Sequence, residues 1–499
     1  FDRLDTDQDG NRIIPANLSM QNIAEDKRGN LWLAAWGTGL VRLGPDMKST
    51  DVYPLPDNRI YILNTQSDGQ IRAGTWGGGL RILHTADATV TSYRTSKALG
   101  VLPNDVVYSL LEDASGELWV GTNGGGVARM DRTRSAFTAW AADPANPGAL
   151  PSGKIIATVV DSRGDLWTSV YSAGVHRLKA GTNTWEHFRH DARDPKSLGD
   201  DTANFMYNDS KGNLWVCTNS GLSLFDPASG NFTTWKNEKD NPASLADTII
   251  YSILEDERGN FWVGTYTAGL DYWDRQAGTF THYAFSPDNP DSISDNLVTS
   301  LVYDERGRLW IGTNNGLNRF EDGKFVRYQY RADNPAGLSS SAVHRIKLDS
   351  DKVLWITTRG GGVNRYNPET DSFDHFTKAD GLPGNIAYNV LEDNSGDLWF
   401  VTQAGIAFFD RETEVIKRVS LYKELENASY NTGSIEGPDG SLYFGAIGIL
   451  AKFDPYRYER NTHIPPVYIT GMTAANQAKL AEPVETLERS LAIHLAYYE

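Results

Sequence analysis

The sequence predicts an all-β protein, a β-propeller of ten four-stranded blades, and two observations support this prediction. The first is a tryptophan that recurs in a short aromatic and β-branched segment. It stands at Trp32, Trp119, Trp167, Trp215, Trp262, Trp310, Trp355 and Trp399, with Arg72 and Tyr443 at the equivalent position of two more copies. The second is the spacing of these positions, which stays between 40 and 48 residues. A period in the forties, with four strands per period, is typical of propeller blades.

One copy of the repeat shows how each strand is predicted. An apolar run ends at Leu254, and Asp256 and Gly259 then suit the first and last positions of a tight turn. The strands of this copy are predicted at residues 249–254, 261–263, 270–273 and 280–283. Aromatic and β-branched residues dominate the later strands, as they do in strands generally. The copy should therefore fold as an antiparallel meander.

The two ends of the chain predict how the ring closes. Phe1–Leu4 matches the fourth strand of the repeat, whereas the last repeat has no fourth strand after residues 449–453. We therefore expect Phe1–Leu4 to complete the last blade, which removes an exposed sheet edge. This favours a single ring of all ten blades over residues 1–456, with two smaller rings as the alternative.

Residues 457–499 do not continue the repeat. They are expected to be a linker followed by the first strands of a truncated Ig-like module, at 466–471 and 491–498. Two strands cannot form an independent sandwich, so the sequence is expected to be a fragment of a longer protein.

Composition and short motifs exclude several classes of function. The chain has 47 basic against 64 acidic side chains and a formal net charge of −17, which argues against nucleic acid as a partner. No apolar run approaches the roughly 20 residues of a membrane span. The single cysteine, Cys217, allows no intrachain disulfide. Asp5, Asp7 and Asp9 begin like a calcium loop, but Ala16 replaces the bidentate glutamate, so a polar turn is favoured over calcium.

The repeated residues are interpreted as structural. A tryptophan at one strand position in so many blades is best explained by packing between neighbouring sheets. The Glu-Asp pairs before the turns, such as Glu255-Asp256, could suggest acid–base chemistry, but adjacent residues of a strand face opposite sides. Turn capping is the favoured interpretation, and neither a catalytic residue nor a metal site is predicted.

Residues that differ between copies are the candidates for binding. The long Asn- and Pro-rich connections between blades, such as 142–147 and 240–245, should emerge on the same face as the loop after the tryptophan strand. Variable loops on a rigid scaffold commonly carry binding sites. One set of positions follows the tryptophan strand: Trp36, Trp76, Asn123, Tyr171, Asn219, Tyr266, Asn314, Arg359 and Gln403. A second set lies near the start of the first strand: Gln21, Tyr61, Tyr108, Ile156, Asn204, Tyr251, Thr299, His344, Tyr388 and Thr432.

Nine members of these sets are predicted to contact a ligand. They are Trp36, Trp76, Tyr108, Tyr171, Tyr251, Tyr266, His344, Arg359 and Tyr388. Flat aromatic rings stack on sugars or peptides, and arginine adds directional hydrogen bonds. The alternative for any one of these residues is hydrogen bonding between blades.

Several copies resemble a known family. Residues 112–129, 255–270, 304–320 and 392–406 resemble the two-component regulator propeller repeat, and residues 464–470 with 491–498 look like the start of the Ig-like three-tyrosine module that follows such propellers. The resemblance implies a periplasmic sensor region of an inner-membrane receptor. A transmembrane helix and a histidine kinase, hybrid kinase or diguanylate cyclase would follow. Known members carry more repeats, arranged in two rings, so this chain departs from the family in its number of repeats.

Three functions are compatible with these observations. The first is a sensor, not itself an enzyme, that binds a small molecule or oligosaccharide and signals through the Ig-like module in a homodimeric receptor. The second is a propeller enzyme acting on polysaccharide, a lyase or glycosidase, which would need an acid partner for His344. The third is a protein-interaction scaffold, which an exposed aromatic patch would favour.

Overall fold

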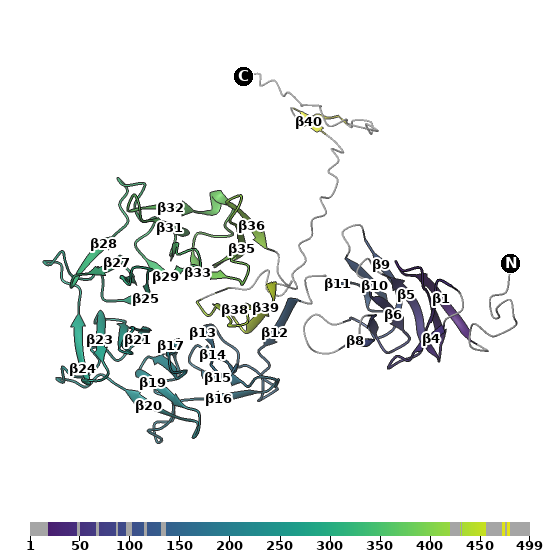
Figure 1. Ribbon diagram of the computed structural model, residues 1–499, viewed down its shortest axis with the longest axis horizontal. Coiled ribbons are helices and arrows are strands. Elements are labelled where there is room, and N and C mark those ends of the chain that lie inside the picture. The colour runs from purple at the N-terminus through teal and green to yellow at the C-terminus, as the bar shows by residue number, and fades with distance from the viewer. Residues whose placement is uncertain are drawn as a thin grey trace. The chain divides into compact units, whose positions relative to one another are not determined.

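The computed structural model describes residues 18–46, 50–65, 69–85, 88–95, 102–113, 117–130, 136–419, 430 and 432–455, and two strands at 472–474 and 477–479. The chain divides into two compact units (Figure 1). The first unit comprises Phe1–Met130 with Arg460–Glu499, and the second comprises Asp131–Glu459. Antiparallel sheets make up both units, as the sequence predicts.

The second unit is a closed ring of seven four-stranded blades (Figure 1). Six blades are consecutive meanders: β13 (Ile155–Val160), β14 (Leu166–Val170), β15 (Gly174–Leu178), β16 (Trp185–Phe188); β17 (Ala203–Asn208), β18 (Leu214–Thr218), β19 (Gly221–Asp226), β20 (Asn231–Trp235); β21 (Ile250–Glu255), β22 (Phe261–Thr265), β23 (Leu270–Asp274), β24 (Thr279–Tyr283); β25 (Val298–Tyr303), β26 (Leu309–Thr313), β27 (Gly316–Glu321), β28 (Lys324–Tyr328); β29 (Val343–Leu348), β30 (Leu354–Thr358), β31 (Val363–Asn367), β32 (Ser372–Phe376); β33 (Ala387–Glu392), β34 (Leu398–Thr402), β35 (Gly405–Asp410), β36 (Val415–Val419). The seventh blade contains β12 (Phe137–Ala141), β37 (Ile435–Glu436), β38 (Leu442–Ala446) and β39 (Ile449–Phe453). Neighbouring innermost strands contact one another around the ring, and β13 contacts β38, which closes it.

A strand from far away in the sequence completes the seventh blade. β12 pairs antiparallel with β39, with Phe137 opposite Phe453 and Ala141 opposite Ile449. The two phenylalanine rings stack with their centroids 4.7 Å apart. The prediction that Phe1–Leu4 closes the last blade is therefore wrong, because β12 holds that edge. Phe1–Leu4 themselves lie outside the described residues.

The prediction of a single ten-bladed ring is also wrong. The seven blades of residues 136–455 close on themselves, so the alternative of smaller rings applies to this part of the chain. The physical reason is that β12 has the pattern of a fourth strand. It is available both to its own repeat and to any blade that lacks one.

The first unit contains three successive sheets. Their strands are β1 (Ser19–Glu25), β2 (Leu31–Trp36), β3 (Gly39–Leu43), β4 (Thr50–Tyr53); β5 (Ile60–Thr65), β6 (Ile71–Thr75), β7 (Leu80–His84), β8 (Thr89–Tyr93); and β9 (Val107–Glu112), β10 (Leu118–Thr122), β11 (Gly126–Met130). The third sheet has three strands because the fourth strand of its repeat, β12, belongs to the second unit. β40 (Met472–Ala474) and β41 (Gln477–Lys479) form an antiparallel pair. The predicted strands at 466–471 and 491–498 lie outside the described residues, so the Ig-like module stays a prediction.

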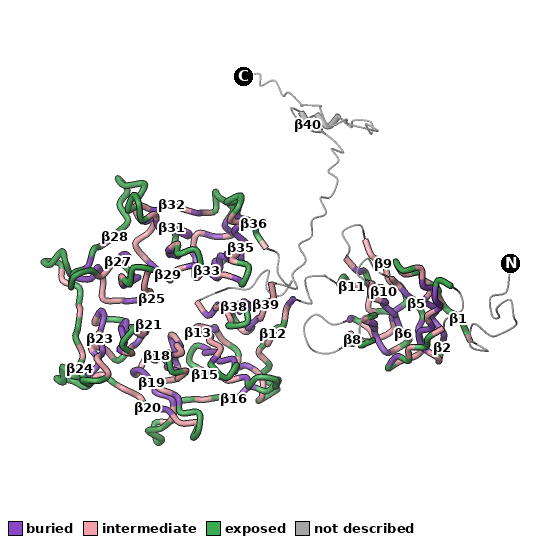
Figure 2. Tube along the Cα trace, viewed as in Figure 1, coloured by how far each residue is buried: buried purple, intermediate pink, exposed green. Residues whose placement is uncertain are grey.

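The apolar core lies between neighbouring blades, and buried residues follow the strands around the ring (Figure 2). Trp310 of β26 is fully buried against Val343 and Ile356 of the next blade. Burying such a side chain contributes about 2–3 kcal/mol. The interpretation of the repeated tryptophans as packing between sheets is confirmed for seven of the eight, whereas Trp119 is 38% exposed.

The turn aspartates bind the same tryptophans. The Trp310 indole N–H donates to Asp304 Oδ2 at 2.8 Å, and Asp304 Oδ1 accepts the backbone N–H of Arg306 at 3.0 Å. The equivalent indole–carboxylate bond is present for Trp32, Trp119, Trp167, Trp215, Trp355 and Trp399. Trp262 differs, because its indole donates to the Tyr303 hydroxyl at 2.8 Å. The turn-capping interpretation of the aspartates is confirmed.

A β-bulge interrupts the first strand of nearly every blade. In β29 the pairing skips from Val343 to Arg345, so His344 is the extra residue. The other skipped residues are Gln21, Tyr61, Tyr108, Ile156, Asn204, Tyr251, Thr299 and Tyr388. A bulge re-aims a side chain away from the regular alternation. This explains why polar and aromatic residues recur at one position of an otherwise apolar strand.

Candidate functional site

The nine candidate residues fall into two groups, one in each unit. Trp36, Trp76 and Tyr108 belong to the first unit, and Tyr171, Tyr251, Tyr266, His344, Arg359 and Tyr388 belong to the second. Because a single ten-bladed ring was predicted, all nine were expected on one ring. The division of the chain into two units separates them into two distinct surfaces.

In the first unit, the aromatic residues form one exposed cluster, which we call the aromatic platform. The Trp76 ring lies 6.4 Å from Trp36, 5.9 Å from Tyr61 and 5.6 Å from Tyr108, measured between centroids. These four side chains are each 36 to 39% exposed. The residues come from three successive sheets, so bulges and loops of all three build the platform.

In the second unit, the candidate residues lie where the loop after the second strand meets the bulge of the first strand. Tyr251, on the bulge of β21, stacks with Tyr266 at 5.4 Å between centroids. Tyr266 is 42% exposed and Tyr171 is 59% exposed. Burial raises the pKa of Tyr251, and the neighbouring phenols of Tyr266 and Tyr171 raise it further. This end of the ring is the channel mouth, defined by Tyr171, Tyr251, Tyr266, His344, Arg359 and Tyr388.

On the bulges of β29 and β33, His344 and Tyr388 form a second stacked pair, 5.2 Å apart. His344 Nδ1 donates to the Ala387 carbonyl at 2.7 Å, which leaves Nε2 as an acceptor for Arg359 Nε at 3.4 Å. Burial lowers the pKa of His344 to about 4, and Arg359, Arg345 and Lys154 act in the same direction. His344 is therefore neutral at physiological pH, and both of its nitrogens are engaged.

Two cationic side chains, Arg359 and Lys154, lie close to His344 at the mouth, although the whole chain is acidic. Neither Arg359 nor Lys154 forms an ion pair with a carboxylate among the residues that the structure describes. Both side chains are exposed, and both act on the same histidine. A cation without a carboxylate partner, in a chain with a net charge of −17, favours contact with an anionic or strongly polar group.

Blade-to-blade hydrogen bonding, the alternative interpretation, holds for part of the second set. Asn204 donates to the Ile250 carbonyl at 3.0 Å, Thr299 to that of Val343 at 2.9 Å, and Thr432 to that of Ile156 at 3.0 Å. His344 makes the same type of bond to the next blade. These side chains fasten neighbouring blades together, whereas the bulge tyrosines present their rings at the mouth.

The connecting loops that surround the mouth are held by their own hydrogen bonds. The Ser244 hydroxyl accepts the Glu238 N–H at 3.0 Å and donates to the Asn241 carbonyl at 2.9 Å, and Leu245 is buried behind it. In the β13–β16 blade, Arg189 of the connecting loop donates to the carbonyl of Ser172 after the second strand, at 3.2 Å. The prediction that both kinds of loop share one face is confirmed for this blade.

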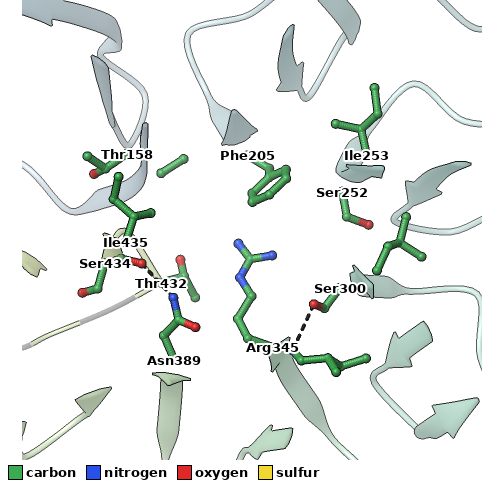
Figure 3. A pocket seen from close by; sticks show the side chains of 13 residues that line it. Thr158, Phe205, Ser252, Ile253, Ser300, Arg345, Asn389, Thr432, Ser434 and Ile435 are labelled. Atoms are coloured by element: carbon green, nitrogen blue, oxygen red, sulfur yellow. Dashed lines mark hydrogen bonds between the residues drawn. The ribbon is translucent and has the colours of Figure 1, made fainter. Parts of the chain in front are cut away.

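Below the mouth, the innermost strands enclose a cavity of about 180 Å³ that the sequence did not predict (Figure 3). Its lining includes Phe205, Ser252, Ser300, Arg345 and Asn389. All five come directly after a bulge residue, a signal that could have located them. Arg345 points into this space toward Phe205 (Figure 3).

Metal binding has no support in the described part of the chain. No group of three or more His, Cys, Asp or Glu side chains that could hold a metal ion occurs among the described residues. Asp5, Asp7 and Asp9 lie outside those residues, so calcium binding there stays an untested expectation. None of the described helices is long and apolar enough to cross a membrane.

Comparison with known proteins confirms the resemblance of the repeats. The family model named two component regulator propeller matches residues 101–124, 244–267 and 292–315. In the structure, the second of these matches covers β21 and β22, the first two strands of one blade. The chain thus carries two-component regulator propeller repeats. No curated protein matches the sequence.

Solved structures with a similar fold include two extracellular domains from B. thetaiotaomicron. The extracellular domain described as hybrid two component system BT3049 is 22% identical with a TM-score of 0.64, and the match covers 95% of this chain and 67% of that one. The corresponding domain of BT4673 is 20% identical with a TM-score of 0.55, covering 95% and 63%. The chain therefore spans about two thirds of each relative. Virginiamycin B lyase from Staphylococcus aureus is 15% identical with a TM-score of 0.48, covering 64% of this chain and 99% of that one.

Proposed function

We propose that this chain is the sensor region of a membrane signalling receptor, exposed to the periplasm or the cell exterior, and that it is not itself an enzyme. It binds a small molecule or an oligosaccharide at the channel mouth of the seven-bladed unit. The observation that carries this proposal is the mouth itself, where exposed tyrosines stand beside the unpaired cation Arg359. Two-component regulator repeats, and a fold shared with extracellular domains of hybrid two-component systems, support the sensor role.

The later steps of signalling belong to the same proposal. The ligand would change how two receptor copies pair, and an Ig-like module would pass this change to a kinase or diguanylate cyclase across the membrane. A ligand shifts an equilibrium only by the difference in its affinity for the two states. Contacts that order the mouth would therefore have to be stronger in one arrangement of the receptor pair than in the other.

The geometry of His344 argues against the rival enzyme. A lyase or glycosidase mechanism at this mouth would need a histidine able to exchange a proton with substrate, with a carboxylate nearby. His344 is fixed in one tautomer by Ala387 and contacts Arg359 instead. Its lowered pKa makes it a poor base at neutral pH.

A second candidate function rests on the aromatic platform of the first unit. Exposed, contiguous aromatic side chains commonly mark interaction surfaces. The platform therefore favours recognition of another envelope protein, in addition to or instead of a small ligand.

A thermal-shift screen of the chain against oligosaccharides and small metabolites tests the proposal. A ligand at one hundred times its Kd adds about 2.7 kcal/mol to stability, which is a visible shift. Tyr266→Ala and Arg359→Ala should abolish the shift. Tyr330→Ala should keep it, because Tyr330 is an exposed tyrosine beyond the outermost strand β28 and not one of the residues that define the mouth. Loss in Trp76→Ala alone would place binding on the platform. A thermal shift that is retained in both Tyr266→Ala and Arg359→Ala would refute the proposal that the ligand binds at the mouth.

A further inference from the structure

Arg345 is a cation without a protein counterion at the centre of the seven-bladed ring. Its Nη1 donates to the Thr299 carbonyl at 2.9 Å, and its guanidinium carbon lies 4.7 Å from the centroid of Phe205. Phe205 belongs to a blade on the other side of the channel (Figure 3). Among the described residues no carboxylate forms an ion pair with Arg345, and its Nε and Nη2 donate to no acceptor there.

The polar neighbours of Arg345 are already engaged in the channel wall. Asn389 donates to the Ser434 carbonyl at 2.7 Å and accepts the Val390 N–H at 3.0 Å. The Ser300 hydroxyl accepts the Ile346 N–H at 3.1 Å (Figure 3). None of these groups carries negative charge, so the wall supplies hydrogen bonds but no counterion.

Arg345 is half-buried in this channel, and a charged group there is costly unless something compensates for it. Burial lowers the pKa of Arg345 to about 10, which still leaves the guanidinium charged at neutral pH. Contact with one aromatic face offsets only part of the cost. The free donors of a guanidinium form a planar fork that matches a carboxylate or another oxyanion.

We propose that the channel is an anion site in which Arg345 binds the carboxylate of a small organic acid. The cavity of about 180 Å³ is close in size to the roughly 150 Å³ that holds one benzene ring in other proteins. Ile253, Leu301 and Ile435 also line it, which suits a short hydrocarbon tail better than a bare inorganic ion. The carboxylate could belong to a free acid or to a larger ligand bound at the mouth. Binding of a free acid at Arg345 does not depend on the proposed ligand site at the mouth.

Titration calorimetry with the whole chain tests this site. Acetate, butyrate, phosphate and sulfate are titrated at constant ionic strength, with sodium chloride as the baseline. Butyrate should bind saturably, and Arg345→Gln should weaken it at least tenfold. Arg345→Lys keeps the charge but not the fork and should weaken butyrate less. Arg306→Gln, at an exposed arginine on the turn between β25 and β26, is the matched control and should leave butyrate binding unchanged.

The outcomes separate the two sources of the carboxylate. If no free acid binds but a ligand found at the mouth loses affinity in both Arg345 variants, the acid group belongs to that larger ligand. Phosphate or sulfate binding more tightly than butyrate would overturn the choice of a carboxylate. An anion response equal to that of chloride, or one retained in Arg345→Gln and Arg345→Lys, would overturn the site. If instead the proposed ligand site at the mouth is wrong, Arg359→Ala will leave binding of the screened ligand unchanged.

Discussion

Replacing Phe137 by alanine should loosen a strand more than 300 residues away in sequence, because Phe137 of β12 stacks on Phe453 of β39. Phe137 is half-buried in the seventh blade, and its ring helps β12 to hold the edge of β39. Without the ring, the edge of the seventh blade should open more often. The remaining blades, which are continuous meanders, should be affected less.

The magnitude follows from the burial of this one ring. Truncating a fully buried phenylalanine to alanine costs about 3–5 kcal/mol. Because Phe137 is only half-buried, about 2 kcal/mol is expected, of which the stacked pair supplies about 1 kcal/mol. At about 1.4 kcal/mol per factor of ten, this corresponds to a roughly 30-fold increase in the opening equilibrium of the edge.

Hydrogen–deuterium exchange read by mass spectrometry measures this opening strand by strand. The peptide covering β39 should exchange faster in Phe137→Ala than in the wild-type chain. Val326→Ala, on the outermost strand β28 of another blade, is the matched control and should leave β39 unchanged. Faster exchange confined to β9–β11 would refute the reasoning, since it would mean that β12 completes its own repeat.

Two further predictions concern the blades and the mouth. Trp310→Phe removes an indole hydrogen bond to a carboxylate and should lower the free energy of unfolding, measured in urea, by about 2 kcal/mol. Trp262→Phe removes a hydrogen bond to a neutral hydroxyl and should lower it by about 1 kcal/mol. Equal losses in the two variants would contradict this prediction. Burial holds the folded pKa of His344 near 4, below its unfolded value of about 6.5, so its contribution to stability is complete above about pH 6.5 and is lost as pH falls toward 4. His344→Asn keeps a donor for the Ala387 carbonyl and does not titrate. Between pH 7 and 4.5, the melting temperature of this variant should therefore fall less than that of the wild type. Equal falls in melting temperature for the two proteins would contradict this prediction.

Much of each blade could be predicted because its causes are local. The strands predicted around Trp262 correspond to β21–β24, since a turn aspartate, a glycine and alternating side chains act within a few residues of one another. The spacing of turn aspartate and tryptophan does not by itself decide the indole bond, because Trp262 follows Asp256 at the same spacing as Trp310 follows Asp304 but donates to Tyr303. Similarly, the second strand of this copy was predicted to end at Val263, whereas β22 continues through Gly264, where a Cβ would come within 2.6 Å of Val298 in the next blade. That constraint comes from a neighbour that the local sequence does not identify.

The candidate site was found in part. Tyr251, Tyr266, His344, Arg359 and Tyr388 do meet in two stacked pairs with a shared cation at one end of the ring. Arg345 was missed, because a regular strand would have alternated its side chain with that of His344 and given no reason to expect it in the channel. The bulge at His344 changes this alternation.

The sequence by itself determined the repeat, the strands within it and the residues that vary on its loop-rich face, because these depend on short-range spacing. Only the tertiary structure decided how the blades are shared between units. Every fourth strand carries nearly the same pattern, so local sequence cannot say which sheet edge β12 will occupy. The choice of β39 depends on the closure of seven blades and on one aromatic pair, Phe137 with Phe453, that exists only once the ring has formed.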